Sequence, residues 1–483
     1  MQIKKALLIL FFCLSVLQSA DGQEYDKSFK KFTPEQLRED LDFVFKKYGT
    51  IHTEFYKEVS KHQVDATLEM LKASISVPLN RVEFMNSFSP VLYHVVKDGH
   101  NYVNGPEEEF QQYLKGGGQL FPVPILMKNN TLYCDSKIGI IPWGAEITNI
   151  NGLPSKLVID KVLAGYNAES WEFAQATNSR WFSGSYWYTF GNMDSYAITF
   201  VSATGEEKNI RLSGQKQSAI DAARMRTQPK ENFSFRMVDG TKVGLLEFNL
   251  CEDLEKFEPF CEKLFADLKT NGSTDLIIDV RNNPGGTTRL GELLYEYITT
   301  KPISQFERIE TKISREKKSE YIQSSRKYEK AFRWYHYLYY PVYVLSSESR
   351  RAMLLAKNGS TLVKRFPPES PKPNPLLFKG KVYLLIGKKT YSAAAILAAT
   401  FKHYQLGTLV GEETGQATTF TANTVELILP NTKLVCSVST SKLYMIGTQD
   451  DGKGVLSDLT LNSNGTSEKD KVLENLIQKL KVP

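Results

Sequence analysis

The stretch GKVYLLIGKKTYSAAAILAAT, residues 380–400, decides how the C-terminal half of the chain is expected to fold. Its apolar run at 382–386 has the length and β-rich composition of a buried strand, and the run that starts at Ala393 is a strong helix former. Ser392 therefore stands at a strand-to-helix junction, where free backbone N–H groups and the helix dipole favour negative charge. This position suits a nucleophile whose attack creates an oxyanion, but capping the helix is the commonest role of such a serine.

The residues around this stretch alternate between predicted strands and helices. A buried strand at 276–280 ends in Arg281-Asn282-Asn283-Pro284-Gly285-Gly286. The paired glycines permit unusual dihedral angles and let backbone N–H groups approach a ligand closely; a plain turn is the alternative. Neither GxGxxG nor a Gly-Lys-Ser/Thr ending is present, which excludes the usual phosphate loops. The other predicted elements are strands at 243–248, 408–410, 424–429 and 433–439, and helices at 253–268, 288–298 and 469–481.

Residues 32–103 carry a helical pattern. Thr33-Pro34-Glu35-Gln36 has the cap and the first-turn proline of a helix start, and further helices are predicted at about 64–74 and 81–96. The last of these runs into Asp98-Gly99-His100. Because Asp-Gly is a turn signal, His100 is expected just past a helix end, where its side chain can project into a cleft. A lone histidine is more often structural or simply exposed than catalytic.

Between residues 116 and 212 the composition shifts to short β segments with Gly, Pro and Asn turns. The segment 144–152 is typical of a strand followed by an Asn-Gly turn, and 155–163 of a short helix. Together they resemble a PDZ-like domain, which can receive an extended peptide as an added strand. The many aromatic residues of this region are more typical of packing than of a ligand site. They are Trp171, Trp181, Phe182, Tyr186, Trp187 and Tyr188.

The segment from 301 to about 377 interrupts the α/β alternation. It is charged and aromatic, and then rich in proline. This composition predicts a helical insertion, which could form a lid or the wall of a substrate channel.

Length, charge and ligand-type residues limit the functions to be considered. The 483 residues predict two or three domains. A net charge of +6 is small for this length, and the basic residues near 315–327 are interspersed with glutamates, so no nucleic-acid partner is expected. The six histidines show no HExxH or comparable spacing, and the cysteines lack the paired spacing of a zinc site. No metal and no cofactor are therefore expected.

The N-terminus has the layout of a secretory signal peptide. Lys4 and Lys5 precede an apolar run at 6–17, and Ala20 and Gly22 are small residues placed for cleavage before Gln23. The run is too short to span a membrane comfortably, and no other stretch approaches that length. The mature protein is therefore expected to be exported, to a periplasm or out of the cell, without an integral membrane segment.

Five features stand in one order: Asp98-Gly99-His100, the PDZ-like unit, residues 279–286, Thr390-Tyr391-Ser392, and Gly411-Glu412-Glu413-Thr414-Gly415. In this order they resemble the tail-specific (C-terminal processing) serine peptidase family, over most of residues 30–480. The resemblance implies an α/β fold with a crotonase-like α/β core, an N-terminal helical region and a PDZ-like β-rich domain. The implied parts are a signal peptide at 1–22, a helical domain carrying His100 at 23–115, a PDZ-like domain at 116–215, and a catalytic core at 216–483 with the helical insertion at 301–377.

The family has two catalytic mechanisms, and the residues of this sequence favour one of them. In the Ser-Lys branch a lysine follows the Gly-Glu-x-Thr stretch, whereas here that stretch continues Gly415-Gln416-Ala417-Thr418. The other branch, similar to tricorn and to the retinoid-binding-protein-like members, takes a histidine from an Asp-Gly-His and an acid from just before a Gly-Val near the C-terminus. His100 and Asp451 fall at these places, with Asp450 the nearest rival of Asp451.

The implied reaction is hydrolysis of a peptide bond through an acyl-enzyme on Ser392. Serine is a poor nucleophile near neutral pH, so His100 would take its proton and return it to the leaving amine, while Asp451 would fix the imidazole tautomer. Backbone N–H groups of Gly285 or Gly286, together with that of Ala393, would form the oxyanion hole. The substrate would be a polypeptide or peptide, which the PDZ-like domain could bind.

Two other functions stay open at this point. The chain could be an inactive member of the family that binds peptide or lipid, although the serine, histidine and acid are all present. It could also be an esterase that uses the same residues, although the Gly-x-Ser-x-Gly elbow of an α/β-hydrolase is absent.

Overall fold

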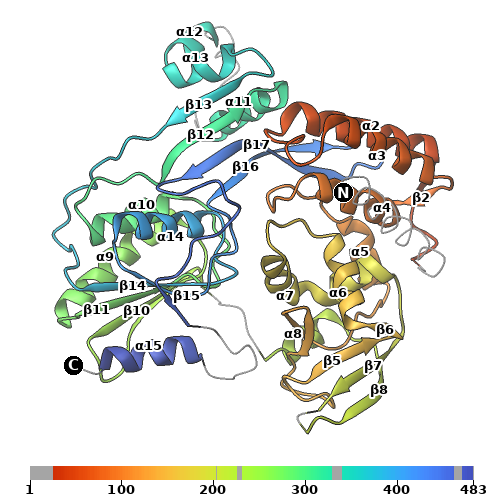
Figure 1. The fold of residues 1–483 in the computed structure, drawn as a ribbon, viewed down its shortest axis with the longest axis horizontal. Coiled ribbons are helices and arrows are strands. Elements are labelled where there is room, and N and C mark those ends of the chain that lie inside the picture. Colours follow the sequence, from red (N-terminus) through yellow and green to blue (C-terminus); the bar gives the residue numbers. More distant parts are fainter. Residues whose placement is uncertain (1–24, 203, 226–230, 329–339, 462–469, 482–483) are drawn as a thin grey trace.

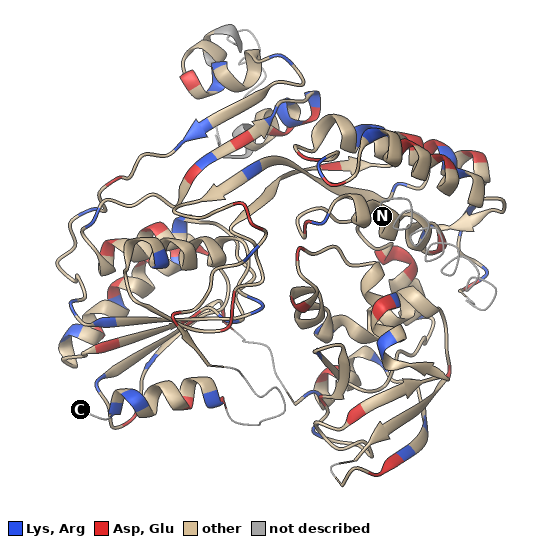
Figure 2. Ribbon diagram, in the orientation of Figure 1, with Lys and Arg blue, Asp and Glu red and all other residues tan. Residues whose placement is uncertain are grey.

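The computed structural model describes residues 25–202, 204–225, 231–328, 340–461 and 470–481 (Figure 1). The expected signal peptide at 1–22 lies outside the described residues. Within them, no helix has the length and apolar character that crossing a membrane requires. Basic and acidic side chains are interspersed along the outer helices (Figure 2).

A six-stranded sheet forms the core of the C-terminal half, in the order β18-β15-β14-β11-β10-β9. All its strands pair in parallel except β9, which is antiparallel to β10. Helices cover both faces, as parallel sheets require, and this is why the strands are nearly continuous apolar runs. The strands are β9 (Phe233–Met237), β10 (Val243–Phe248), β11 (Asp275–Asp279), β14 (Lys381–Ile386), β15 (Thr408–Gly411) and β18 (Leu459–Thr460).

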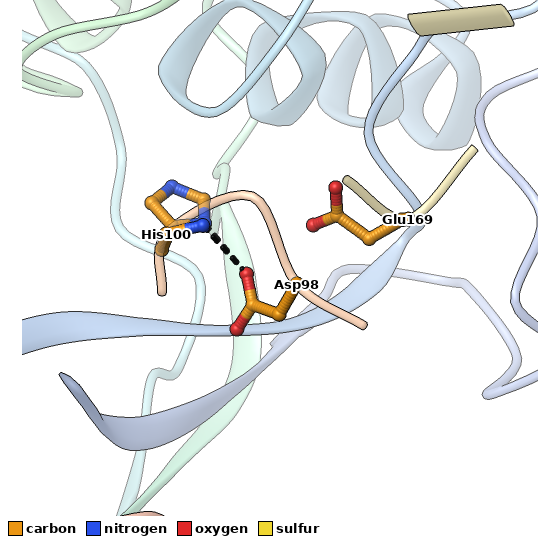
Figure 3. A group of neighbouring side chains, drawn as sticks. All are labelled: Asp98, His100 and Glu169. Atoms are coloured by element: carbon orange, nitrogen blue, oxygen red, sulfur yellow. Dashed lines mark hydrogen bonds and ion pairs between the residues drawn. The ribbon is translucent and has the colours of Figure 1, made fainter. Parts of the chain in front are cut away.

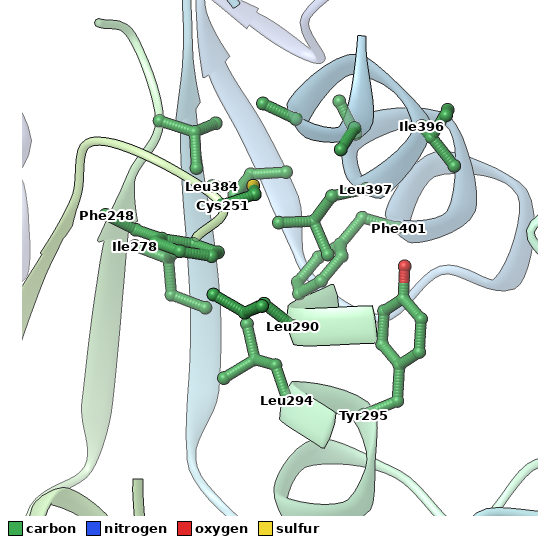
Figure 4. Close-up of a cluster of buried hydrophobic side chains, with 14 of the residues drawn as sticks. Phe248, Cys251, Ile278, Leu290, Leu294, Tyr295, Leu384, Ile396, Leu397 and Phe401 are labelled. Atoms are coloured by element: carbon green, nitrogen blue, oxygen red, sulfur yellow. The ribbon is translucent and has the colours of Figure 1, made fainter. Parts of the chain in front are cut away.

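The two faces of this sheet bury different helices (Figure 1). On one face α9 (Leu254–Thr270), α10 (Arg289–Ile298) and α14 (Ala393–Tyr404) pack against side chains such as Phe248 and Leu384 (Figure 4). On the other face lies α15 (Lys471–Lys481). The strand–helix alternation predicted from the sequence is therefore confirmed, and α14 begins directly after Ser392.

A four-stranded antiparallel sheet in the order β13-β12-β17-β16 connects the core to the N-terminal helices. Its strands are β12 (Phe306–Lys312), β13 (Thr361–Arg365), β16 (Thr419–Ile428) and β17 (Val435–Met445). One end of the β16–β17 hairpin buries apolar side chains in the same cluster as α2 (Pro34–Ile51), α3 (Lys61–Ser74) and α4 (Arg81–Val95). The hairpin thus brings the N-terminal half against the core.

The inserted segment at 301–377 is only partly helical. Its described residues contribute β12 and β13 to the connecting sheet as well as three helices. Strand β12 forms because it pairs with β17 on one side and β13 on the other. The helices are α11 (Arg315–Tyr328), α12 (Tyr340–Leu345) and α13 (Glu348–Leu355).

The β-rich part between the N-terminal helices and the core has an antiparallel sheet in the order β3-β4-β5-β7-β8. Helix α7 (Trp171–Phe190) buries Phe182 and Tyr186 in its core, whereas Trp181 of the same helix is 60% exposed. The strands are β3 (Ile125–Lys128), β4 (Thr131–Cys134), β5 (Glu146–Ile150), β6 (Leu153–Pro154), β7 (Ser195–Val201) and β8 (Glu207–Ser213). The remaining elements are β1 (Lys31–Phe32), β2 (Leu79–Asn80), α5 (Glu107–Lys115), α6 (Ser155–Ala164) and α8 (Gln217–Ala223).

Candidate active site

Ser392 has an unusual backbone conformation, with φ 49° and ψ −122°. This region is sparsely populated by residues other than glycine, and such strain persists where the surrounding structure imposes it. Ser392 occupies the N-cap position of α14, but its side chain makes no capping hydrogen bond. The hydroxyl is therefore not used to cap the helix, which was the alternative to a nucleophile.

His100 lies in the turn that follows α4, and strand β17 holds that turn in place. The Ser437 hydroxyl donates to the His100 carbonyl at 3.1 Å, and the Ser439 N–H donates to Asn101 Oδ1 at 2.8 Å. Two backbone hydrogen bonds follow, from Ser437 N–H to the Tyr102 carbonyl and from Asn104 N–H to the Val435 carbonyl. Because β17 also pairs with strands of the core half, these contacts fix His100 relative to Ser392.

The structure brings His100 and Ser392 together although 292 positions separate them. His100 Nε2 lies 3.4 Å from Ser392 Oγ, and His100 Nδ1 lies 3.2 Å from Asp98 Oδ1 (Figure 3). A proton on Nδ1 directed at the carboxylate leaves Nε2 free to accept the serine proton. The Nε2–Oγ separation is slightly long, as is common for catalytic hydrogen bonds in structures without substrate.

Asp98 is a well-supported carboxylate at the base of this arrangement. Its Oδ1 also accepts the His100 backbone N–H at 2.8 Å, and its Oδ2 accepts from Asn101 Nδ2 at 2.8 Å and from the Ser439 hydroxyl at 3.3 Å. These donors hold the buried carboxylate in one orientation, with Oδ1 directed at the imidazole. Asp98 thus occupies the place that the sequence assigned to Asp451.

The structure does not bring Asp451 or Asp450 to His100. Asp451 Oδ1 accepts the Lys453 N–H at 3.0 Å within its own loop, and Asp450 Oδ2 pairs with Lys442 Nζ at 2.6 Å. Among the described residues, neither aspartate contacts the imidazole. The physical reason is that each carboxylate is held by a nearby lysine residue, while Asp98 already occupies Nδ1 of the imidazole.

The backbone N–H groups expected to form an oxyanion hole differ in their hydrogen bonding. In the part of the chain that the structure describes, neither the Gly286 N–H nor the Ala393 N–H donates to another group. The Gly285 N–H is different, because it donates to Asn283 Oδ1 at 2.8 Å. Of the two predicted glycines, Gly286 therefore offers the available donor, and Gly285 has a steric role instead.

Gly285 approaches the serine so closely that a side chain cannot be added without displacement. A Cβ atom there would lie 2.6 Å from Ser392 Cβ and 2.9 Å from the Ala393 nitrogen, and the φ of Gly285 is +107°. We expect Gly285→Ala to lower kcat by about 100-fold, since displacement of a reacting group by about 1 Å costs that much. Peptide hydrolysis by the purified variant measures this.

Gly240→Ala is the matched control for this prediction. Gly240 has a φ of +67° but no atom within 4 Å of an added Cβ, so the variant carries backbone strain without displacing Ser392. If both variants keep the same kcat, the close approach of Gly285 to Ser392 has no role in catalysis.

The electrostatic environment of His100 favours a proton on the imidazole. Burial opposes this, but the hydrogen bond to Asp98, the charge of Asp98 and the charge of Glu169 outweigh it, so the pKa of His100 lies above its ordinary value. The pKa of Glu169 is itself raised to about 7, chiefly by burial and next by the charge of Asp98, against the opposing effect of His100. The ionisable groups around the imidazole therefore influence one another's titration.

Asp98, His100 and Glu169 each offer an atom of the kind that binds metals, and these atoms lie within 4.8 Å of one another (Figure 3). These side chains already take part in hydrogen bonds within the protein. Asp98 bonds to His100, and Glu169 bonds to Tyr391 and Gln416. These contacts account for the cluster without an ion.

Sequence reasoning missed three residues of this site: Asp98, Glu169 and Tyr391. Asp98 was within the quoted Asp-Gly-His motif but was interpreted only as a turn residue. A signal was present, because an aspartate often accepts a hydrogen bond from the backbone two residues on, and Asp98 does so with His100. No signal in the sequence pointed to Glu169, which the fold brings in from the loop before α7.

Comparisons with known proteins concern the fold and the class of the chain. Residues 242–461 match the model of Peptidase family S41, a span that includes Ser392 and the glycine loop but not His100. Similar solved structures are a mutant of CPAF (13% identity, TM-score 0.63), mature CPAF (16%, 0.59) and mature CPAF complexed with lactacystin (15%, 0.56). Each comparison covers 93% of this chain and 97% or 98% of the other. No curated protein matches the chain.

The fold and the family match define the class of this protein as a serine-type peptidase. The part of the chain that matches peptidase family S41 is residues 242–461, and this is the family of C-terminal processing peptidases that the sequence resembles. Its substrates are accordingly peptides.

Proposed function

We propose that this protein is an exported serine endopeptidase in which Ser392 is the nucleophile, His100 the general base and Asp98 the acid that orients His100. The observation that carries the proposal is the 3.4 Å separation between His100 Nε2 and Ser392 Oγ, with Asp98 at Nδ1. The position of Ala417, where the other branch of the family has a lysine, supports a histidine as the base.

The reaction begins with attack of Ser392 Oγ on the carbonyl carbon of the scissile peptide. His100 Nε2 takes the hydroxyl proton as the C–O bond forms, and the carbonyl electron pair moves onto its oxygen. The Gly286 and Ala393 N–H groups stabilise that oxyanion, aided by the N-terminus of α14.

Collapse of this intermediate breaks the C–N bond, and the imidazolium gives its proton to the leaving amine. Water then repeats the sequence: His100 removes its proton, the hydroxide adds to the acyl carbon, and the ester bond to Ser392 breaks as the proton returns to Oγ. Asp98 accepts the hydrogen bond from Nδ1 throughout and so keeps that nitrogen protonated. The product is a peptide with a new carboxylate.

Peptide binding by the β-rich domain is part of the proposal, and the sheet edges indicate where it occurs. Strand β3 is one edge, but α7 covers it: Ser179 Oγ accepts the Met127 N–H at 2.7 Å, and Gln175 Oε1 accepts the Asn130 N–H at 2.8 Å. Strand β8 is the other edge and is largely exposed. Because an added strand needs free backbone groups, we assign β8 as the edge that a peptide pairs with.

A fluorophosphonate probe tests the proposed nucleophile. We expect the probe to label the purified protein once per chain, on Ser392, because it reacts with serine hydroxyls that a neighbouring base activates. Mass spectrometry of proteolytic fragments locates the label, and the Ser392→Ala variant should not be labelled. Undiminished labelling of Ser392→Ala, or a folded wild-type protein that neither reacts with the probe nor cleaves casein, would contradict the proposal.

A further inference from the structure

Four aromatic rings from different parts of the chain form a continuous stack at the active site. The ring of Phe173 in α7 lies 4.2 Å from that of Tyr391 with an interplanar angle of 9°. The Tyr391 ring then lies 5.2 Å from the imidazole of His100, and the Phe420 ring covers the other face of the imidazole at 5.4 Å. The imidazole is thus held between two rings, one of which belongs to the residue before Ser392.

Glu169 anchors the tyrosine of this stack. Each of its carboxylate oxygens lies 2.9 Å from the Tyr391 hydroxyl, and that hydroxyl lies 3.5 Å from His100 Nδ1. The turn that carries His100 packs directly on the pair: a Cβ atom at Gly99 would lie 2.5 Å from the Tyr391 hydroxyl and 3.3 Å from Glu169 Oε2. A displacement of Glu169 or Tyr391 would therefore move the turn and its histidine.

We propose that Glu169 is a positioning residue of the peptidase reaction, which acts on His100 through the hydroxyl and ring of Tyr391. The proposal rests on the proposed function, since it assumes that His100 is the base for Ser392. Glu169 is not itself a catalytic residue, because among the described residues its carboxylate bonds to the side chains of Tyr391 and Gln416 and not to His100 or Ser392. Its contribution is to hold the imidazole plane and to place a second negative charge beside it.

Glu169 faces several ionisable groups, and His100 is one of them. They are Asp98 and His100 from the turn after α4, Tyr391 before α14, and Tyr166 after α6. The pKa of Glu169 is raised to about 7, so it gains or loses its proton in the same range as an imidazole. When ionised, Glu169 raises the pKa of His100. The loss of activity at low pH then reflects the coupled titration of His100 and Glu169, and not that of His100 alone.

Gln416 provides independent support for a Glu169 that changes its protonation state. Its Nε2 donates to Glu169 Oε1, whereas its own Oε1 is buried without a partner. A carboxylate accepts from the amide nitrogen, and a protonated carboxyl group needs an acceptor. Turning the amide over would offer the unpartnered oxygen to a protonated Glu169, so the same side chain can satisfy either state.

The experiment compares Glu169→Gln with Glu172→Gln, a control that removes the same charge from an exposed position three residues further on. For each, kcat/KM for a peptide and the rate of fluorophosphonate labelling are measured between about pH 5 and about pH 9. We expect Glu169→Gln to lower kcat about 10- to 100-fold with little change in KM, because the base is misplaced. The fall in its activity on the acid side of the profile should also move to lower pH. Loss of the Glu169 charge lowers the pKa of His100, so the imidazole stays neutral, and able to act as a base, at a lower pH.

A second variant keeps the proposal testable if Glu169→Gln does not fold. Tyr391→Phe retains the ring stack but releases Glu169, and the lost hydrogen bond raises the pKa of that carboxyl group. Its acid limb should move in the same direction as in Glu169→Gln, by a smaller amount. Profiles of both folded variants that coincide with that of Glu172→Gln would overturn the proposal while Ser392 still reacts with the probe. Absence of labelling at Ser392 in the wild-type protein would instead overturn the proposed function.

Discussion

Replacing His100 by alanine should lower kcat for a peptide substrate by about a million-fold, the loss that removal of the base causes in a serine peptidase with a histidine base. The physical reason is that Ser392 then has no group within reach to take its proton. His100 Nε2 at 3.4 Å is the sole base that the described residues place against Ser392 Oγ. Steady-state hydrolysis of a fluorogenic peptide measures the loss, and fluorophosphonate labelling of Ser392 should slow in parallel.

His62→Ala is the control for this variant. His62 is an exposed residue of α3, and its loss removes an imidazole without touching the site. Activity of His100→Ala within tenfold of His62→Ala would show that another base serves Ser392 and would remove His100 from the mechanism.

The sequence was sufficient to predict the elements that hold Ser392. Strand 382–386 and the alanine-rich helix are determined by local composition, and the structure has β14 and α14 at these places. The helix starts are equally local: Thr33 forms the capping box that its motif predicts. The segment 301–377 was less predictable, because β12 becomes a strand by pairing with β13 and with β17, which lies more than a hundred residues further on.

The site was predictable where it depended on motif order and not where it depended on packing. Ser392 and His100 were named from motifs, and the β16–β17 hairpin then brings them into contact. Glu169 reaches the same place from a different domain, through contacts that no local pattern encodes. Asp451 was predicted as the acid from its position in the family's motif order. Whether its loop reaches the imidazole depends on the tertiary structure, and the structure has Asp98 at Nδ1 of His100 instead.

The choice between these two aspartates gives the second large prediction. We expect Asp98→Asn to lower kcat about 10,000-fold, because an amide at this position donates to Nδ1 and so stabilises the tautomer that carries its proton on Nε2. That tautomer cannot accept the serine proton. The remaining activity should also have its acid limb at lower pH, because Asp98 raises the pKa of His100 and asparagine does not.

Asp451→Asn is the matched control, since it makes the same chemical change on an exposed loop where the carboxylate contacts Lys453. The structure predicts that this variant retains its activity and its pH profile, and the two variants are compared on one peptide under identical conditions. A larger loss in Asp451→Asn than in Asp98→Asn would mean that the C-terminal loop closes over His100 when substrate binds. The acid of the working enzyme would then be Asp451, and Asp98 would serve only to form the turn.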